Sequence, residues 1–446
     1  MSVAPDSTEE KLDFKRIFPI FAVVLVDLLG LTIIIPLLPL YAATFRANPL
    51  TIGLLGAAYP TMQFLAAPIL GRLSDRYGRK PILVLSQIGT LIGFLLLGFA
   101  NSLALLFLSR LIDGFSGGNT STAQAMIADS TSERTRTQGL GLIGAAFGLG
   151  FIVGPIIAFA ALSLSGENYR IPAFIAAGLS ALSILLSAFW LRETHHPADS
   201  ASASRTSFAP GATLRWLAAP QVGLLLALMF AQQFAFGGFE QFLPLFDLSR
   251  LGLNGSGNAA VFVYVGVIVV IIQGWLVGKW SRAWGERRLI YIGLATLALG
   301  LALTALTPSQ PVPWYSRAAA EAELGATQDA TAVALPGDAN TGWLGLAWLL
   351  VAMIPASIGG GVLSPSINSL LTRQVSSQQR GEILGASSAC FSAANVIAPL
   401  VGGALFQLAG ASAPFWLWAL VLALILAWAW RGLPAEKSPI ATTAES

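Results

Sequence analysis

The chain has 446 residues, of which 55% are hydrophobic and only 11% are charged, and its formal net charge is +3. A soluble protein of this length needs far more charge to cover its surface, so the composition indicates an integral membrane protein surrounded by the lipid bilayer. Cys390 is the only cysteine, no catalytic motif is present, and we expect no metal site, no cofactor and no enzyme activity.

Twelve apolar runs follow one another along the chain, and each approaches the ~20 residues that a helix needs to cross the hydrocarbon core. In the first half the runs are 17–41, 50–70, 81–99, 103–127, 139–162 and 171–191. In the second half they are 220–246, 258–277, 288–306, 342–364, 383–408 and 414–430. The sequence therefore predicts an all-α fold of twelve transmembrane spans.

Polar segments divide these spans into two groups of six. The predicted order is an N-terminal tail at 1–16, a first bundle at 17–191, a linker at 192–219, a second bundle at 220–432 and a C-terminal tail at 433–446. The linker is rich in Ser, Ala and Pro and contains both histidines, which is typical of a flexible hinge. Within the second bundle, the long polar loop 307–341 is predicted to be mostly disordered, with one short helix at 317–324.

The distribution of lysine and arginine predicts the orientation. If the N-terminus is cytoplasmic, the inside segments contain 20 of the 25 cations, as the positive-inside rule requires. The start of the chain is acidic and lacks the basic region of a cleavable signal peptide. We expect a multi-pass protein of the inner (plasma) membrane with both termini cytoplasmic. Its scattered cations lack interleaved aromatics, so no nucleic-acid partner is expected.

The densest charge cluster is the stretch 71–80 between spans two and three, with four cations and one carboxylate. It is predicted to be a tight turn, in which glycine permits close backbone approach or a positive φ. Gly71, Ser74 and Gly78 recur 207 positions later in the stretch 278–288, between spans eight and nine. This internal repeat indicates two pseudo-symmetric six-helix bundles with a substrate site between them near the membrane midplane.

Three charged residues fall deep inside predicted spans, where a charge costs roughly 2.5–3.5 kcal/mol. Asp27 lies in span one, and Arg110 and Asp113 lie three residues apart in span four, where they can pair. These residues allow two interpretations. They form neutralised contacts that only fix helix packing, or they form a proton-coupling site, because a nearby guanidinium alters how readily a buried carboxylate takes up a proton.

Polar and aromatic residues within the spans suggest an amphiphilic substrate cavity. The candidates are Tyr59, Gln63, Asn119, Gln124, Gln232, Gln233, Phe236, Glu240 and Asn368. Individually, each polar side chain is more often a helix–helix contact than a ligand contact. Glu240 lies close enough to the end of span seven to belong to the membrane interface instead.

Span five is rich in glycine and contains Gly144, Gly148, Gly154 and Pro155. Small residues allow close helix packing, and proline can kink a helix. The pattern fits ordinary packing and also fits a moving interface between two halves.

Together these motifs resemble the major facilitator superfamily in its twelve-helix drug/proton antiporter branch, and most closely the tetracycline/proton antiporters. The stretch 71–80 matches the loop signature of the superfamily, and Arg110–Gly114 resembles its proton-linked motif. The run from Gly144 to Pro155 resembles the antiporter motif, although Ala158 stands where a glycine usually follows. Span nine departs from the tetracycline antiporters, which carry an aspartate there, because 288–306 contains no acid.

The resemblance implies a cytoplasmic gate in which Asp75 and Arg79 pair with Asp129. The gate residues are Gly71, Asp75, Arg76, Gly78, Arg79 and Asp129. It also implies proton coupling through Asp27, Arg110 and Asp113.

The predicted function is a proton-coupled antiporter that exports hydrophobic or cationic organic compounds by alternating access. Its partners are the lipid bilayer, protons and a small-molecule substrate, and we expect it to act as a monomer. Two alternatives remain open at this point. One is a proton symporter or a uniporter for a sugar or an organic acid, and the other is a transporter-like receptor that moves nothing.

Overall fold

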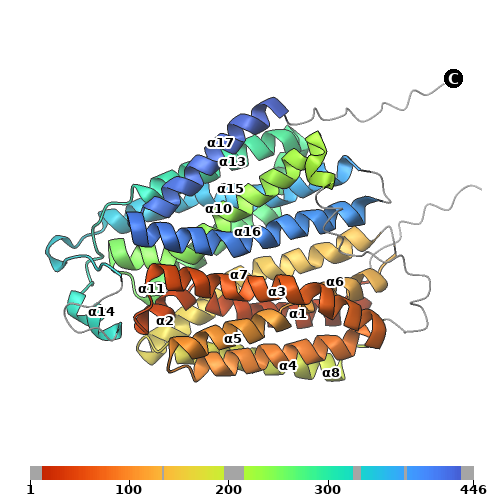
Figure 1. Cartoon of the computed structure of the whole chain (residues 1–446), viewed down its shortest axis with the longest axis horizontal. Coiled ribbons are helices and arrows are strands. Elements are labelled where there is room, and N and C mark those ends of the chain that lie inside the picture. The colour runs from red at the N-terminus through yellow and green to blue at the C-terminus, as the bar shows by residue number, and fades with distance from the viewer. Residues whose placement is uncertain (1–12, 133–134, 195–214, 325–332, 376–378, 433–446) are drawn as a thin grey trace, which may run out of the picture. The chain divides into compact units, whose positions relative to one another are not determined.

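The computed structural model describes residues 13–132, 135–194, 215–324, 333–375 and 379–432. Within these ranges the regular structure is helical and includes no strand (Figure 1). Most of the predicted linker and tails lies outside the described residues, including both histidines, so the hinge at 192–219 stays a prediction.

The predicted spans all correspond to helices. Those of the first half are α1 (Phe14–Ile34), α2 (Leu38–Thr44), α3 (Pro49–Tyr77), α4 (Arg79–Gly98), α5 (Leu103–Ser116), α6 (Asn119–Asp129), α7 (Arg136–Ser165) and α8 (Arg170–Phe189). Those of the second half are α10 (Pro220–Leu251), α11 (Gly255–Ile271), the π-helix η2 (Ile272–Leu276), α12 (Val277–Trp284), α13 (Glu286–Ala305), α15 (Leu344–Arg373), α16 (Arg380–Ala409) and α17 (Ala413–Gly432). Two short helices, α14 (Arg317–Glu323) and η3 (Asp338–Asn340), lie in the loop before α15.

Eleven helices among the described residues are long and apolar enough to cross a membrane. The predicted fourth span is missing from this set because it is made of two shorter helices, α5 and α6, on either side of Gly117 and Gly118. With this interrupted span the count is compatible with twelve. The prediction of an all-α membrane protein is therefore confirmed, and the interruption of span four is a feature that hydropathy does not show.

Two other spans are also interrupted. Span one breaks between α1 and α2, where Pro36 and Pro39 lie close together and proline removes a backbone donor. Span eight passes through the π-helix η2, an irregularity that often marks a functional position in a helix.

The chain divides into two compact units. The first unit comprises Met1–Ile34, Met62–Ile157 and Arg170–Ser204, and the second comprises Ile35–Thr61, Ala158–Tyr169 and Arg205–Ser446. In the first unit, α4 packs between α5 and α8, and α1 packs against α8 and α6 (Figure 1). Spans three and four, three and six, and one and six are thus paired.

The second unit repeats this pairing. There α13 packs against α15 and α17, and α10 packs against α17 and α16. The pairs therefore join spans nine and ten, nine and twelve, and seven and twelve. Because each pair lies six spans after its counterpart, the packing within each unit agrees with the internal repeat read from the sequence.

The long loop between spans nine and ten is packed where the structure describes it, so the expectation of disorder is wrong there. Val312 N–H donates to Leu251 O at 3.0 Å, and Gly342 N–H donates to Pro311 O at 2.7 Å. The predicted short helix is confirmed as α14, and Ser316 caps it by accepting from Ala319 N–H. Residues 325–332 of this loop lie outside the described residues.

Candidate functional site

The charged stretch between spans two and three is almost entirely helical, and its turn is a single residue. α3 ends at Tyr77 and α4 begins at Arg79, so Gly78 alone reverses the chain with φ 99°. A side chain is strained at such a φ, and a Cβ here would also meet the Glu193 carboxylate. Pro81 lies in the first turn of α4, where its missing N–H costs nothing.

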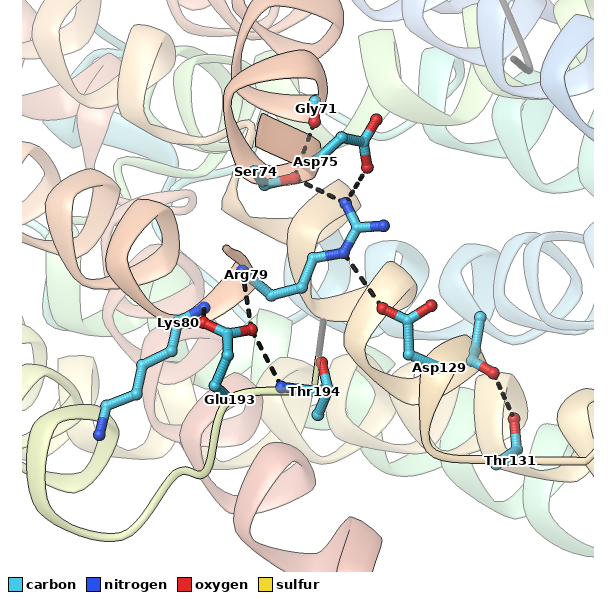
Figure 2. A network of polar contacts seen from close by, with 10 residues as sticks. Gly71, Ser74, Asp75, Arg79, Lys80, Asp129, Thr131, Glu193 and Thr194 are labelled. Atoms are coloured by element: carbon cyan, nitrogen blue, oxygen red, sulfur yellow. Dashed lines mark hydrogen bonds and ion pairs between the residues drawn. The ribbon is translucent and has the colours of Figure 1, made fainter. Parts of the chain in front are cut away.

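Arg79 is the centre of the polar network at this turn (Figure 2). Its guanidinium pairs with the Asp75 carboxylate, and its Nε donates to Asp129 Oδ2 at 3.2 Å. The same guanidinium donates to Ser74 Oγ at 2.8 Å. Asp129 is the last residue of α6, where the helix dipole disfavours a negative charge, so it depends on Arg79 for compensation. Arg79 thus joins Asp75 to Asp129, and of the contacts that the family resemblance implies, the structure contains the one between Arg79 and Asp129.

Glu193 is a further member of this network, and the sequence analysis did not identify it. Its Oε1 accepts from Arg79 N–H at 2.9 Å and its Oε2 accepts from Lys80 N–H at 3.1 Å (Figure 2). Without Glu193, these two N–H groups at the start of α4 would lack an acceptor, because Gly78 has no side chain to cap them. A carboxylate after α8 therefore caps a helix that begins more than a hundred residues earlier.

The second copy of the stretch forms a comparable network with its charges exchanged. Gly285, which corresponds to Gly78, makes the turn with φ 76°. The next residue is Glu286 where the first copy has Arg79, and Arg373 NH2 donates to its Oε1 at 2.6 Å. Ser281 and Ser369 also donate to this oxygen, at 3.2 and 3.0 Å. Arg373 is the last residue of α15, as Asp129 is of α6.

Arg110 and Asp113 form a buried ion pair on α5, with a nitrogen–oxygen distance of 3.1 Å. The two residues are 1% and 2% exposed. The Arg110 guanidinium lies 5.7 Å from the centre of the Phe94 ring. Removing the two charges from water costs free energy that offsets most of their attraction. The pair therefore adds little net stability, and a role in helix packing alone does not explain it.

The pair lies one turn before the interruption between α5 and α6. This interruption frees backbone carbonyls that water cannot reach in a membrane, and each of them needs a partner. Gln63 of α3 supplies one, because its Nε2 donates to Gly117 O at 2.8 Å. Gln63 was predicted to line a substrate cavity, and here its amide satisfies the broken helix beside Asp113.

We expect Gln63→Leu to lower the free energy of unfolding by about 1 kcal/mol, because the Gly117 carbonyl loses its donor. This corresponds to a drop of roughly 1 °C in the melting temperature of the purified protein. Gln124→Leu is the control, since Gln124 is exposed on α6 of the same unit. Equal losses in the two variants would contradict a specific role for Gln63.

The other predicted residues of the first unit lie on separate helices. Asp27 is a half-buried residue of α1, and Asn119 begins α6, but its side chain falls outside the described part of the chain. In α7, Gly154 packs against Thr32 of α1 so closely that a Cβ would overlap it, whereas Gly144 faces open space. Gly148 and Pro155 belong to the same helix.

The remaining cavity candidates belong to the second unit. Gln233 Nε2 donates to Asn395 Oδ1 at 2.8 Å, and Asn368 Oδ1 accepts from Ser387 Oγ at 3.2 Å, so both join α16 to a neighbouring helix. Gln232 is 2% exposed. The others, Tyr59, Phe236 and Glu240, are half-buried.

Asp247 of α10 was not identified from the sequence, although it is an acid near the end of a predicted span. It is 0% exposed, and neither carboxylate oxygen has a hydrogen-bond partner among the described residues. Its position at the end of an apolar run was the available signal, and Glu240, seven residues earlier in the same helix, was identified by that signal.

Comparison with known proteins adds to this geometry. The family model of the Major Facilitator Superfamily matches residues 20–326 and 330–446. The tetracycline resistance protein, class B, of Escherichia coli is 29% identical over 404 residues, which are 90% of this chain and 91% of that protein. Multidrug resistance protein 2 of Bacillus subtilis (strain 168) is 25% identical over 390 residues, which are 86% of this chain and 87% of that protein.

Solved structures show the same fold. The crystal structure of the human organic anion transporter MFSD10 (TETRAN) matches 94% of this chain and 100% of its own chain, with a TM-score of 0.58 and 23% sequence identity.

Proposed function

We propose, from the premise that this chain belongs to the Major Facilitator Superfamily, that it is a proton-coupled antiporter exporting hydrophobic or cationic organic compounds. The chain is a multi-pass membrane transporter of that family and is not an enzyme. Beyond membership of the family, we propose the coupling ion, the direction of transport and the substrate class. We also propose the gate and the alternating access on which transport depends.

The buried Arg110–Asp113 pair carries the proposal. A carboxylate in this position exchanges a proton only when the guanidinium moves or a cationic substrate competes for it. The interruption of span four one turn further on supplies a point at which such a movement can start. Discontinuous helices also hold the coupling sites of other secondary transporters. Asp27, the other charged residue deep within a span of the first half, is proposed to share the proton pathway.

The names of the relatives support the substrate class, since they include tetracycline resistance and multidrug resistance proteins. The aromatic and amide residues proposed for the cavity suit a largely apolar organic molecule. We place both termini in the cytoplasm of a cell whose inner membrane contains the protein as a monomer. The networks of Arg79 and Glu286 then lie at the cytoplasmic ends of their spans and act as gates.

Everted vesicles from a host without its own exporters test the proposal. In vesicles acidified inside by respiration, adding ethidium or tetracycline should dissipate part of the pH gradient. The reason is that each molecule carried into the lumen is exchanged for protons that leave it. Asp27→Asn and Asp113→Asn should each abolish the response. Glu321→Gln, which removes an acid from the loop helix α14, should leave it unchanged.

Other outcomes of this assay would indicate a different function. Uptake of the compound without a pH change would indicate a uniporter, and proton movement in the same direction as the substrate would indicate a symporter. A chain that inserts normally but moves none of a broad panel of compounds would contradict a transport function.

A further inference from the structure

A small cavity in the second unit is built around the loop helix α14, and we name it the α14 pocket. Its volume is about 90 Å³, and its lining includes Leu40, Tyr169, Leu248, Trp314, Tyr315 and Glu323. Glu323 is the only charged side chain among the described residues that line it. The walls are therefore mostly aromatic and aliphatic, with Asn254 and Ser316 as uncharged polar residues and one carboxylate.

The Glu323 carboxylate has no basic partner in the part of the chain that the structure describes. Its Oε1 accepts from the Tyr169 hydroxyl at 2.7 Å, and no lysine or arginine of the described residues forms an ion pair with it. Burial raises the pKa of Glu323, the Tyr169 hydrogen bond lowers it, and the nearby Glu167 raises it again. Arg317, the cation on the same helix, is engaged by Glu321 at 2.8 Å. The site therefore holds an excess of negative charge in partly desolvated surroundings.

The rings are held in place by contacts outside the pocket. Tyr169 stacks on Tyr41, with ring centres 5.6 Å apart and planes within 12°. Tyr315 donates from its hydroxyl to Pro336 O at 2.9 Å, and Trp314 packs edge-on against Trp343 at 5.4 Å. Binding a ligand would thus require little ordering of these side chains.

Aromatic faces beside a carboxylate are the surroundings that recognise an organic ammonium group. We propose that the α14 pocket binds a small organic cation, with the rings of Tyr169, Trp314 and Tyr315 around its alkyl groups and Glu323 opposite its charge. The volume, about that of three water molecules, accommodates a trimethylammonium or primary ammonium head. None of these residues belongs to the proposed coupling site, so the proposal does not depend on transport.

Choline and its neutral isostere 3,3-dimethylbutan-1-ol test the proposal on the purified protein in maltoside micelles. Saturation-transfer NMR should detect choline binding in the millimolar range, with the alcohol at least about tenfold weaker, because it lacks the charge. Glu323→Gln should weaken choline binding about tenfold, and Trp314→Leu several-fold. Ala322→Gln, at an exposed position of the same helix outside the pocket, leaves the Arg317–Glu321 pair intact and should bind choline like the parent.

Equal binding of choline and the alcohol by the parent protein would overturn the proposal without any variant, even if Glu323→Gln does not fold. Equal losses in Glu323→Gln and Ala322→Gln would overturn it as well. Nanodiscs of phosphatidylglycerol alone and with phosphatidylethanolamine distinguish the source of the ligand. Competition by phosphatidylethanolamine would identify a lipid headgroup as the occupant, and its absence would identify a free cation.

Discussion

Arg110→Leu is expected to destabilise the protein by about 3–5 kcal/mol, because it leaves the Asp113 carboxylate buried without its counter-charge. In a chain of this size, that corresponds to a fall of roughly 4 °C in the melting temperature. The double variant Arg110→Leu/Asp113→Leu should recover most of the loss, since it replaces both charges with apolar groups of comparable shape. The measurement is thermal unfolding of the three purified proteins in the same detergent.

This pair of variants separates the two interpretations left open by the sequence. If Arg110 and Asp113 only fix helix packing, the double leucine variant should be stable and should still transport. If they form the coupling site, it should be stable and inactive in the vesicle assay. A double variant that is as unstable as Arg110→Leu would contradict the energetic argument itself.

The sequence predicted the spans well because crossing a membrane imposes one long apolar helix per span, whatever its neighbours are. It missed the interruption of span four, because Gly117 and Gly118 are apolar enough to leave the hydropathy unchanged. The role of Gln63 followed from that interruption and could not be predicted without it. The packed part of loop 307–341 was also missed, since its contacts with Leu251 and Tyr169 join segments far apart in the chain.

The turn residues show a similar division. The motif itself predicted the turn at Gly78 and, by resemblance, the pairing of Arg79 with Asp129. Glu193 could not be found, because nothing in its own segment indicates a helix terminus that lies elsewhere in the chain. The exchange of Arg79 for Glu286 was visible at the constant offset of 207 positions, but its partner Arg373 required the fold.

Reversing the charge of either Glu286 or Arg373 alone is expected to have the second large effect. Arg373→Glu places a second carboxylate against Glu286, a side chain that is 7% exposed and otherwise held by two serine hydroxyls. Glu286→Arg places two guanidinium groups together. Because the Arg373 side chain is 60% exposed, water screens part of the repulsion. We therefore expect each single variant to lose about 2 kcal/mol of stability, which is below the value for a fully buried pair.

The double variant Glu286→Arg/Arg373→Glu should recover most of this loss, because the first copy already shows the exchanged arrangement to be compatible with the turn. There Arg79 donates to Ser74 Oγ, whereas in the second copy Ser281 Oγ donates to Glu286. A serine hydroxyl both donates and accepts, so the same scaffold holds either charge. Melting temperature and vesicle transport should fall in both single variants and recover together in the double one. If the double variant recovers its stability but not its transport, the sign of the charge matters to the gate. If neither its stability nor its transport recovers, the equivalence of the two copies is contradicted.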